Sequence, residues 1–473
     1  MKYISTRGQI KPIGFQDAVM MGLADDGGLI VPESIPSVAD RLDELAAMDY
    51  PALACEIIGL FATDIPTNDL RELMRRTYGE RYFTNDEAGL SGGGRVAPSV
   101  PVGDLHILEL WHGPTLAFKD VALQLLGNLF EYILARRGGR LNILGATSGD
   151  TGSAAIHGCR GRDGLDIFIM HPRGRVSEIQ RRQMTSVLDA NVHNLAVEGS
   201  FDDCQRIMKT LASDIDFKRT YSLGAVNSVN WARVLAQIVY YFKAAFDVTA
   251  ATGAQAVRVS VPTGNFGDIL AGYYARRMGA PISGLILATN ENDILSRFFN
   301  TGVYSLGEVY RTLSPSMDIQ VASNFERYLF YKVGCDGGRI REMMEQFGKT
   351  GSLEIETDGP VDPLFTAGAA DRQAVLATIR DTYRQHNYVL DPHTACGVHV
   401  ANQQPGGDPL VCLATAHPAK FPDAVAAATG RDDLATHPCI AELMAAEERC
   451  TVLPEDIEAV RSFIENTVAG HSA

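Results

Sequence analysis

The residues most able to do chemistry lie in the run 111–120, where one lysine, Lys119, stands between a turn and an apolar helix pattern. Gly113-Pro114 predicts the turn, and Thr115 is a suitable cap for the helix that follows. A lysine at a helix N-terminus among apolar neighbours has a lowered pKa, because the helix dipole and lost hydration both disfavour its charge. A neutral amine can form a Schiff base with an aldehyde. The alternative is an ordinary lysine whose charged end reaches water.

Two glycine-containing loops each join a buried strand to a helix, the setting in which backbone N–H groups bind an anion. The first, Gly264-Asn265-Phe266-Gly267-Asp268, lacks the lysine of a nucleotide P-loop and the glycine spacing of a dinucleotide fold. We therefore expect it to bind a small phosphate group. The second, Ser148-Gly149-Asp150-Thr151, offers hydroxyl and N–H groups for a carboxylate or another phosphate. For both loops the alternative is a tight turn without a ligand.

Further polar side chains lie at the start of one predicted helix and at the end of one predicted strand. Ser228 and Arg233 belong to the run that opens a long apolar helix, and an arginine there could bind a phosphate through two hydrogen bonds. The alternative for Arg233 is a surface position. Thr415 follows the last predicted strand, where its hydroxyl could meet a ligand. The histidines in the run 391–399 match no zinc spacing, so we expect no metal.

The elements that must position these residues change character near residue 100. From there short apolar runs alternate with amphipathic helices, which indicates βαβ units and parallel sheets. The predicted strands are 141–144, 166–170, 192–197, 257–261, 285–288 and 410–414. The predicted helices begin near 117 and 422 and cover 151–159, 177–184, 201–212, 231–246 and 267–278. Sites in such folds lie at the carboxyl ends of the strands, where both loops and Thr415 are expected.

The chain divides into three predicted parts. Residues 1–95 form a mainly helical N-terminal domain that ends in a glycine-rich linker at 91–95. Residues 96–430 form the core, and between about 292 and 370 its strand rhythm weakens, which predicts a helical insertion over the sheet. Residues 431–473 form a C-terminal helical tail whose last helix, 454–468, is predicted to be acidic and exposed.

Composition excludes several classes of protein. Of the 473 residues, 46% are hydrophobic and 21% are charged, which is typical of a globular protein. The net charge of −15, without a long basic run, argues against nucleic acid as a partner. No run approaches the roughly 20 apolar residues that span a bilayer, and the N-terminus has no apolar signal core. Eight scattered cysteines without a C-x-x-C pair favour free thiols in the cytoplasm.

Taken together, these runs resemble the threonine synthase family, and the resemblance extends over nearly the whole chain. The matching runs are 3–8, 23–29, 111–120, 148–152, 227–233, 264–268 and 415–421. The resemblance implies an α/β fold of type II among pyridoxal-phosphate-dependent enzymes, with a core of two parallel-sheet lobes and a mainly helical N-terminal domain.

The resemblance also implies a role for each candidate residue. Lys119 matches the lysine that binds pyridoxal phosphate and acts as the catalytic base. Residues Gly264 to Asp268 match the loop that binds the cofactor's phosphate, and Thr415 matches the hydroxyl that faces the pyridine nitrogen. Ser148 to Thr151 match the loop for the substrate carboxylate. The holders of the substrate phosphate would be Ser228, Arg233 and Thr151.

The implied reaction converts O-phospho-L-homoserine and water into L-threonine and phosphate, the last step of threonine biosynthesis. We expect a monomer or homodimer that acts on this small molecule. One alternative is another type II enzyme, such as a serine or threonine dehydratase or an O-acetylserine sulfhydrylase, which the N-terminal domain and the run 227–233 disfavour. A second alternative is a non-catalytic protein of this kind that binds phosphate ligands, which the presence of Lys119 disfavours.

Overall fold

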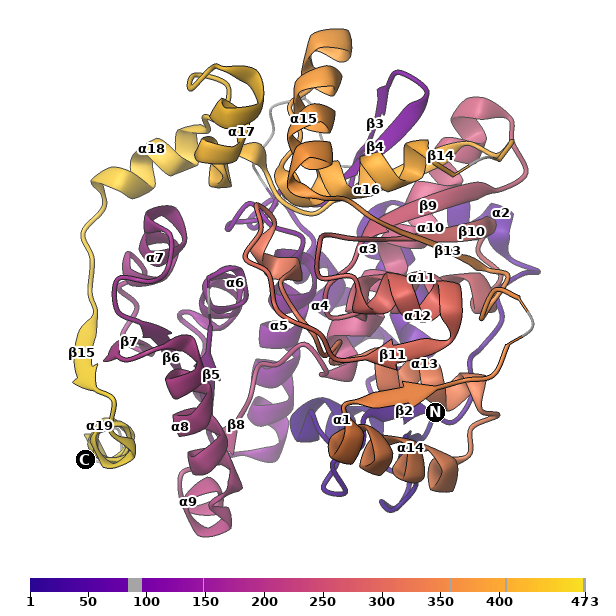
Figure 1. Cartoon of the computed structure of the whole chain (residues 1–473). Helices are drawn as coiled ribbons and strands as arrows, with labels where there is room; N and C mark the ends of the chain where they lie inside the picture. Colours follow the sequence, from indigo (N-terminus) through magenta and orange to yellow (C-terminus); the bar gives the residue numbers. More distant parts are fainter. Residues whose placement is uncertain (84–95, 148, 358, 405, 471–473) are drawn as a thin grey trace.

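The structure is a computed structural model that describes residues 1–83, 96–147, 149–357, 359–404 and 406–470. The predicted linker at 91–95 therefore lies outside the described residues. Two β-sheets with their covering helices form two lobes (Figure 1). The predicted fold class, two α/β lobes with mainly parallel sheets and a mainly helical N-terminal segment, is confirmed.

The small lobe (residues 141–224 and 451–470) contains a sheet of five parallel strands in the order β15-β7-β6-β5-β8. Every residue of β6 is buried, as expected for a parallel strand that is covered on both faces. The strands are β5 (Leu141–Ala146), β6 (Leu165–Pro172), β7 (Val192–Glu198), β8 (Leu223–Gly224) and β15 (Thr451–Pro454). The helices between them are α6 (Asp150–Cys159), α7 (Glu178–Thr185), α8 (Phe201–Ser213) and α9 (Ile215–Thr220).

The large lobe (residues 99–109 and 257–429) contains a six-stranded sheet in the order β13-β10-β9-β14-β4-β3, and only its edge strand β3 runs antiparallel to its neighbour. The late strand β14 lies between β9 and β4, so the carboxyl ends of these three strands lie side by side. The strands are β3 (Ser99–Val102), β4 (Leu105–Glu109), β9 (Val257–Pro262), β10 (Ile282–Thr289), β13 (Phe365–Ala369) and β14 (Leu410–Ala414).

Two long buried helices pack against each other, α5 (Lys119–Arg137) and α10 (Trp231–Thr252). Sixteen of the 22 residues of α10 are buried, and a helix that is apolar on all sides belongs in a core. Helix α10 runs six residues beyond its predicted end, until Gly253 adopts the left-handed conformation that stops it. No helix in the described part of the chain is long and apolar enough to cross a membrane.

The N-terminal segment packs its apolar side chains into the same core as α5 and α10. Its helices α1 and α3 contact α5 and α10 respectively, and α4 contacts α5. Its elements are β1 (Tyr3–Ser5), α1 (Phe15–Met21), β2 (Ile30–Pro32), α2 (Leu42–Ala46), α3 (Tyr50–Gly59) and α4 (Thr67–Thr77). The buried guanidinium of Arg327 joins this segment to the site, because it donates to the carbonyls of Ile30 and Val229.

Helices make up most of the regular structure in the predicted helical insertion, 292–370, but the prediction missed its strands. Two of them pair as a small antiparallel sheet, and the last, β13, returns to the edge of the six-stranded sheet. The elements are α12 (Ile294–Thr301), β11 (Val303–Ser305), the short 3₁₀ helix η2 (Pro315–Met317), α13 (Phe325–Lys332), α14 (Gly337–Thr350) and β12 (Ser352–Glu354). These strands have three to five residues each, too few for a clear alternating pattern.

The C-terminal part of the chain first completes the large lobe and then crosses to the small lobe (Figure 1). Its elements in the large lobe are α15 (Arg372–His386), α16 (Pro392–Asn402), the 3₁₀ helix η3 (Pro418–Lys420) and α17 (Pro422–Thr429). The crossing segment 431–450 contains α18 (Pro438–Ala445) and leads to β15 and α19 (Ile457–Gly470). Helix α19 therefore begins three residues after the predicted start at residue 454, because residues 451–454 form β15.

Candidate active site

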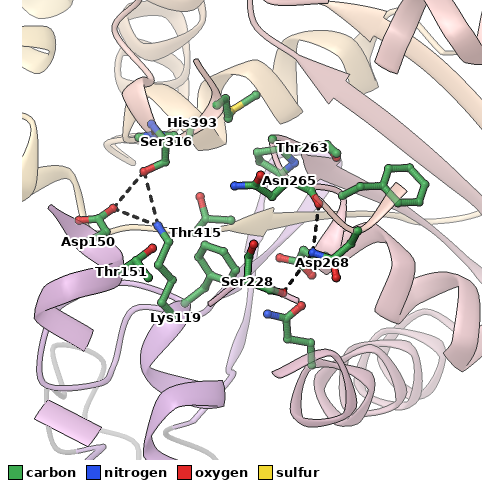
Figure 2. A pocket seen from close by; sticks show the side chains of 18 of the residues that line it. Lys119, Asp150, Thr151, Ser228, Thr263, Asn265, Asp268, Ser316, His393 and Thr415 are labelled. Atoms are coloured by element: carbon green, nitrogen blue, oxygen red, sulfur yellow. Dashed lines mark hydrogen bonds and ion pairs between the residues drawn. The ribbon is translucent and has the colours of Figure 1, made fainter. Parts of the chain in front are cut away.

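Lys119 is the first residue of α5, near the predicted helix start, and it is buried in a pocket between the lobes. Its amine lies 3.3 Å from Oδ2 of Asp150 and 3.4 Å from Oγ of Ser316 (Figure 2). Burial lowers the pKa of Lys119. Asp150 opposes that effect, whereas the positive charges of Lys420 and Arg233 add to it. The amine is thereby prepared to lose its proton more readily than an exposed lysine.

A tight turn before α5 sets the position of Lys119. The backbone N–H and the hydroxyl of Thr115 each donate to the carboxylate of Asp120 at 2.8 Å. A side chain on Gly113 would clash with Asp120, since its Cβ would lie 2.4 Å from the aspartate Cβ. The prediction that Thr115 caps α5 is wrong, because the turn folds its hydroxyl onto Asp120 while Phe118 is the capping residue. Burial raises the pKa of Asp120 to about 6.

Helices α5 and α6 bring Lys119 and Asp150 together, because each helix begins with one of these residues. The two helices pack closely through a pair of glycines. A Cβ on Gly127 would lie 1.9 Å from the carbonyl oxygen of Gly158, and a Cβ on Gly158 would lie 2.4 Å from that of Leu123. The contact therefore has no space for a methyl group, and it fixes the relative position of the two helix starts.

The second predicted loop lies at the start of α6, and its member Ser148 is outside the described residues. The hydroxyl of Thr147 accepts the backbone N–H groups of Gly149 and Gly152 at 3.0 and 2.9 Å. Thr151 lines the pocket. The carboxylate of Asp150 faces Lys119 (Figure 2). Burial opposes its ionisation, but Lys420 and Lys119 outweigh burial and hold its pKa well below the usual range.

The first predicted loop joins β9 to α11 (Gly267–Met278) and lines the pocket opposite Asp150 (Figure 2). Phe266 holds the loop in place, because it adopts a left-handed backbone conformation and its ring packs against Phe299 and Phe365. The first N–H groups of α11 have no partner within the helix and are available to an anion. Gly264 is required by the close approach of η2, since its Cβ would lie 2.8 Å from the carbonyl oxygen of Ser316.

Asp268, at the end of this loop, accepts hydrogen bonds on one carboxylate oxygen only. Tyr240 and Tyr241 donate to its Oδ1 at 2.5 and 3.0 Å. Its Oδ2 is buried without a partner in the described part of the chain. Burial raises the pKa of Asp268 to about 6, although both tyrosine hydroxyls favour the ionised form. The group is thus half-protonated near pH 6, well above the usual range of an aspartate.

Arg233 is buried on the first turn of α10, and within the described residues its Nε and Nη1 have no hydrogen-bond partner. Burial lowers its pKa to about 10. A buried cation without an anion is costly, so this guanidinium fits a site for an anionic ligand. Nearby, the hydroxyls of Ser228 and Ser323 lie 2.6 Å apart, and Ser323 donates to Asn265. This contact ties the start of α10 to the loop before α11.

Thr415 follows β14 and lines the pocket between the two loops (Figure 2). Its carbonyl accepts the N–H of Phe118 at 2.9 Å, which holds the end of β14 against the turn before Lys119. The structure thus brings the described candidate residues into one pocket, except Gly149, which is not among the residues that line it.

These residues fit pyridoxal phosphate. A buried amine is present for the aldehyde, a helix N-terminus and an unpaired guanidinium are present for phosphate groups, and a hydroxyl is present for the ring nitrogen.

Three residues near Lys119 were not assigned chemistry from the sequence: Ser316, His393 and Lys420. Ser316 comes from η2 in the insertion and lies between Lys119 and Asp150. Its N–H donates to Nε2 of His393 at 3.3 Å, and Nδ1 of His393 lies 2.9 Å from Asp391. His393 therefore carries its proton on Nδ1 in this arrangement. In the described residues no group of three histidine, cysteine or acidic side chains is placed to hold a metal ion.

Comparison with family models matches three segments of the chain. The model described as "Threonine synthase N terminus" matches residues 2–78, and the one described as "Threonine synthase, C-terminal" matches residues 394–464. The model described as "Pyridoxal-phosphate dependent enzyme" matches residues 96–359, more than half of the chain. The three matches together include every candidate residue, with Thr415 in the C-terminal one.

Individual relatives are similar to this chain over nearly its whole length. A threonine synthase from Pseudomonas aeruginosa is 48% identical over 473 residues, which cover 98% of both chains. The crystal structure of PLP-bound threonine synthase from Brucella melitensis has a TM-score of 0.93, with 46% sequence identity and 99% of both chains covered. The crystal structure of threonine synthase from yeast has a TM-score of 0.91, with 39% identity and the same coverage.

Proposed function

The chain belongs to the threonine synthase family, and from that premise we propose that the pocket around Lys119 converts O-phospho-L-homoserine and water into L-threonine and phosphate. The protein is a pyridoxal-phosphate-dependent lyase. The observation that carries the assignment to this pocket is the buried amine of Lys119 in one cavity with the unpaired guanidinium of Arg233. An amine suits the cofactor's aldehyde, and a buried cation without a partner suits a phosphate-bearing substrate.

Pyridoxal phosphate, when bound, supplies the electron sink that makes the substrate's Cα and Cβ protons acidic. In our assignment Nζ of Lys119 holds the cofactor through its aldehyde carbon. The N–H groups from Gly264 to Asp268 hold its phosphate. The hydroxyl of Thr415 faces the ring nitrogen, and because a hydroxyl does not keep that nitrogen protonated, the electron sink is milder than with a carboxylate there.

Lys119 is also the proposed base. When its nitrogen is free of the cofactor, the amine of Lys119 would take the proton from the substrate's Cα and serve the proton transfers at Cβ and Cγ. Burial supports this role because it lowers the pKa of Lys119. Asp150 and Ser316, at 3.3 and 3.4 Å, hold the amine on the pocket side of α5. Phosphate would leave from Cγ as Cβ loses a proton, Cγ would then take up a proton, water would add its hydroxyl at Cβ, and Cα would regain its proton.

The two ends of the substrate are assigned to opposite groups in the pocket. Arg233 and Ser228, with the hydroxyl of Thr151, bind the phosphate. The N–H groups of the loop 148–151 bind the carboxylate. Since Asp150 is itself a carboxylate that faces Lys119, the donors for a substrate carboxylate in this loop are its backbone and its hydroxyl groups.

Turnover of O-phospho-L-homoserine tests the proposal. We expect phosphate and L-threonine to form in equal amounts, and borohydride reduction to fix the cofactor on the peptide that contains Lys119. Lys119→Ala should lower turnover by at least about 10³-fold, because it removes both the attachment and the base. The matched control Lys243→Ala, which removes a lysine paired with Asp247 on α10, should keep activity.

The alternatives give different products. Ammonia released from serine or threonine, without threonine formed from O-phospho-L-homoserine, would identify a dehydratase. Sulfide-dependent cysteine formation from O-acetylserine would identify a sulfhydrylase. Binding of phosphate ligands without any turnover would identify a non-catalytic protein. Each of these results contradicts the proposed reaction.

We further propose that the protein acts in the cytoplasm as a monomer or homodimer, on small molecules and without nucleic acid. The net charge of −15 supports the last point. We also retain the division into residues 1–95, 96–430 and 431–473 as a proposal. The family matches at 2–78 and 96–359 support a boundary near residue 95, and size-exclusion chromatography tests the oligomeric state.

A further inference from the structure

Lys420 is a buried lysine beside the pocket that no step of the proposed reaction uses. It ends η3, five residues after Thr415, and is 3% exposed. Its ammonium donates to three acceptors. These are the carbonyl of Thr115, at 2.6 Å from Nζ, Oε1 of Gln183, at 2.9 Å, and Oδ1 of Asp150, at 2.9 Å. An ammonium has three N–H bonds, so all of them are occupied.

The three acceptors belong to three different elements next to Lys119. Thr115 lies in the turn before Lys119, Gln183 lies on α7 of the small lobe, and Asp150 opens α6. The ammonium is therefore fixed relative to the start of both catalytic helices. A lysine that merely filled space here would need only its apolar stem in contact with these elements.

Asp150 is held between two ammonium groups. Lys420 lies 2.9 Å from its Oδ1, and Lys119 lies 3.3 Å from its Oδ2. Gln180 also donates to Oδ1 at 2.9 Å. The two cations outweigh burial and hold the pKa of Asp150 well below its usual range.

The two cations differ in permanence. Lys119 loses a positive charge whenever its nitrogen gives up a proton during the proposed cycle, whereas Lys420 takes no part in that cycle and keeps its three acceptors. Without Lys420, each such step would leave Asp150 as a lone buried carboxylate, which is strongly unfavourable. With Lys420 present, the carboxylate keeps a counter-ion in every state of Lys119.

We propose that Lys420 is a positioning residue that keeps a permanent carboxylate beside the nitrogen of Lys119 and, through its own charge, favours the unprotonated form of that nitrogen. The inference rests on the proposed function only in taking Lys119 as the reacting amine. Because it concerns protonation, every charged or titratable group facing Lys119 matters. Those groups are Asp120 on α5, Asp150 on α6, Lys420 on η3, Arg233 on α10, Asp268 on α11 and His393 on α16.

The test is a pH titration of the visible absorbance of the holoenzyme without substrate, which reports protonation of the Lys119 nitrogen. Two neutral variants, Lys420→Gln and Lys420→Met, should raise the midpoint by roughly one unit, because a positive neighbour is removed. Lys420→Arg keeps the charge and should titrate like the parent protein. Asp150→Asn removes a negative neighbour and should lower the midpoint. Lys243→Met, away from the pocket, should change nothing.

A second readout does not use the bound cofactor. In the apoprotein, the pH dependence of acetylation of Lys119, followed by mass spectrometry, should show the same upward displacement in the neutral Lys420 variants. If those variants fold and bind the cofactor but their midpoints equal that of the parent, the proposal is wrong. It is also wrong if Lys420→Arg moves the midpoint as far as Lys420→Met does.

A variant that leaves a lone buried charge can fail to fold, so a double variant provides an independent comparison. Asp150→Asn with Lys420→Met removes both charges, and its midpoint should lie above that of Asp150→Asn alone. Equal midpoints would contradict an electrostatic effect of Lys420. Since no substrate is present, a protein that titrates as expected but forms no threonine would reject the proposed function and leave this inference intact.

Discussion

Arg233 holds a charge inside the pocket, and two of its nitrogens have no partner among the described residues. Such a charge is unfavourable until an anion binds. Arg233 therefore favours binding of an anionic ligand but lowers the stability of the ligand-free protein. Without a ligand it destabilises the fold, and with a phosphate group bound it forms charge-assisted hydrogen bonds. Both effects can be measured in one variant.

We expect Arg233→Met to raise the free energy of unfolding of the apoprotein by about 1–2 kcal/mol, because a buried unpaired cation is replaced by an apolar group. The same change should lower kcat/KM for O-phospho-L-homoserine on the order of 100-fold, since a buried charge partner is worth about 3 kcal/mol. Urea unfolding and steady-state kinetics check the two effects.

The control for this prediction is Arg297→Met, which removes a partly exposed arginine of α12 that pairs with Asp293 at 2.8 Å and donates to Ser305, away from the pocket. It should leave the kinetics unchanged. A loss of stability in Arg233→Met without added ligand would contradict the account of Arg233 as an unpaired cation.

The titration of Asp268 makes the free energy of unfolding of the apoprotein depend on pH. Its pKa is about 6 in the folded protein, raised by burial, and about 3.9 in an unfolded chain. Between these values the folded state binds the extra proton, so the free energy of unfolding falls as pH rises and becomes constant above about pH 6. Asp268→Asn removes this dependence, because an amide does not titrate. Its oxygen still accepts hydrogen bonds from both tyrosines, so the local structure is kept.

Relative to Asp268→Asn, the parent protein should lose about 2 kcal/mol of unfolding free energy between pH 4.5 and 7. Urea unfolding of both proteins across this range measures the difference. Asp120, whose pKa is also about 6, is present in both proteins and cancels in the comparison. A difference that is constant with pH, or that grows in the opposite direction, would show that Asp268 titrates normally.

The predicted site residues could be found from the sequence, because polar and charged side chains occur there beside turn-forming residues at the ends of predicted strands. Ser316 could not be found in that way, since it contacts Lys119 across 197 positions in sequence from a segment without strand rhythm. Lys420 lies in the family-like run 415–421, but nothing local to it indicates burial beside a carboxylate. His393 was considered only as a metal ligand, and its contact with Ser316 depends on the tertiary fold.

At the scale of elements, the glycine contact between α5 and α6 matters most for the chemistry. Both helices begin at the pocket, and their crossing determines how far Lys119 stands from Asp150. A methyl group inserted at the crossing would separate the helices and change that distance. The effect on catalysis would come from a residue that does not touch the pocket.

We expect Gly127→Ala to lower the free energy of unfolding by about 2–3 kcal/mol, as overpacking does in tight contacts, and to lower kcat more than it changes KM. Thermal or urea unfolding and kinetics measure both. The matched control is Gly348→Ala in α14, where a Cβ would meet nothing within 4 Å. That change should raise stability by about 0.5–1 kcal/mol, because alanine favours a helix more than glycine does. Normal kcat in Gly127→Ala would show that the helices tolerate separation.

Most elements of the core were predicted from hydrophobic periodicity, because buried parallel strands are mainly apolar runs and α5 and α10 bury most of their residues. Prediction failed where tertiary contacts decide the local structure. The cap of α5 is one case, since Thr115 turns to Asp120. The short strands β11, β12 and β15 are another, because pairing with distant partners gives them their conformation.

At the scale of the whole molecule, the crossing segment 431–450 attaches the C-terminus to the small lobe. Glu448 forms ion pairs with Arg181 and Arg182 of α7, and Arg449 donates to backbone carbonyls next to β7. Beyond it, β15 pairs with β7 and α19 covers α8. Helix α7 also supplies Gln180 and Gln183, which contact Asp150 and Lys420.

We expect Val460→Asp to lower the free energy of unfolding by about 3 kcal/mol or more, because this fully buried side chain of α19 packs in the small-lobe core. Limited proteolysis should cut the variant first after residue 430. The control Val452→Asp changes a half-exposed residue of β15 and should have little effect. Equal proteolysis of Val460→Asp and the parent protein would show that α19 does not stabilise the small lobe.

The order of strands in the six-stranded sheet has a consequence for how the protein is made. Strand β14, which lies between β9 and β4, is formed by residues 410–414, and β15 of the small lobe is formed by residues 451–454. While the ribosome is still translating, β4 and β9 each expose an edge for which the partner has not yet been synthesised. Unpaired edges invite association with other chains. We therefore expect the large lobe to be completed only after residues 410–414 have been synthesised and the small lobe only after residues 451–454. A chain truncated before residue 410 should be captured by chaperones or aggregate.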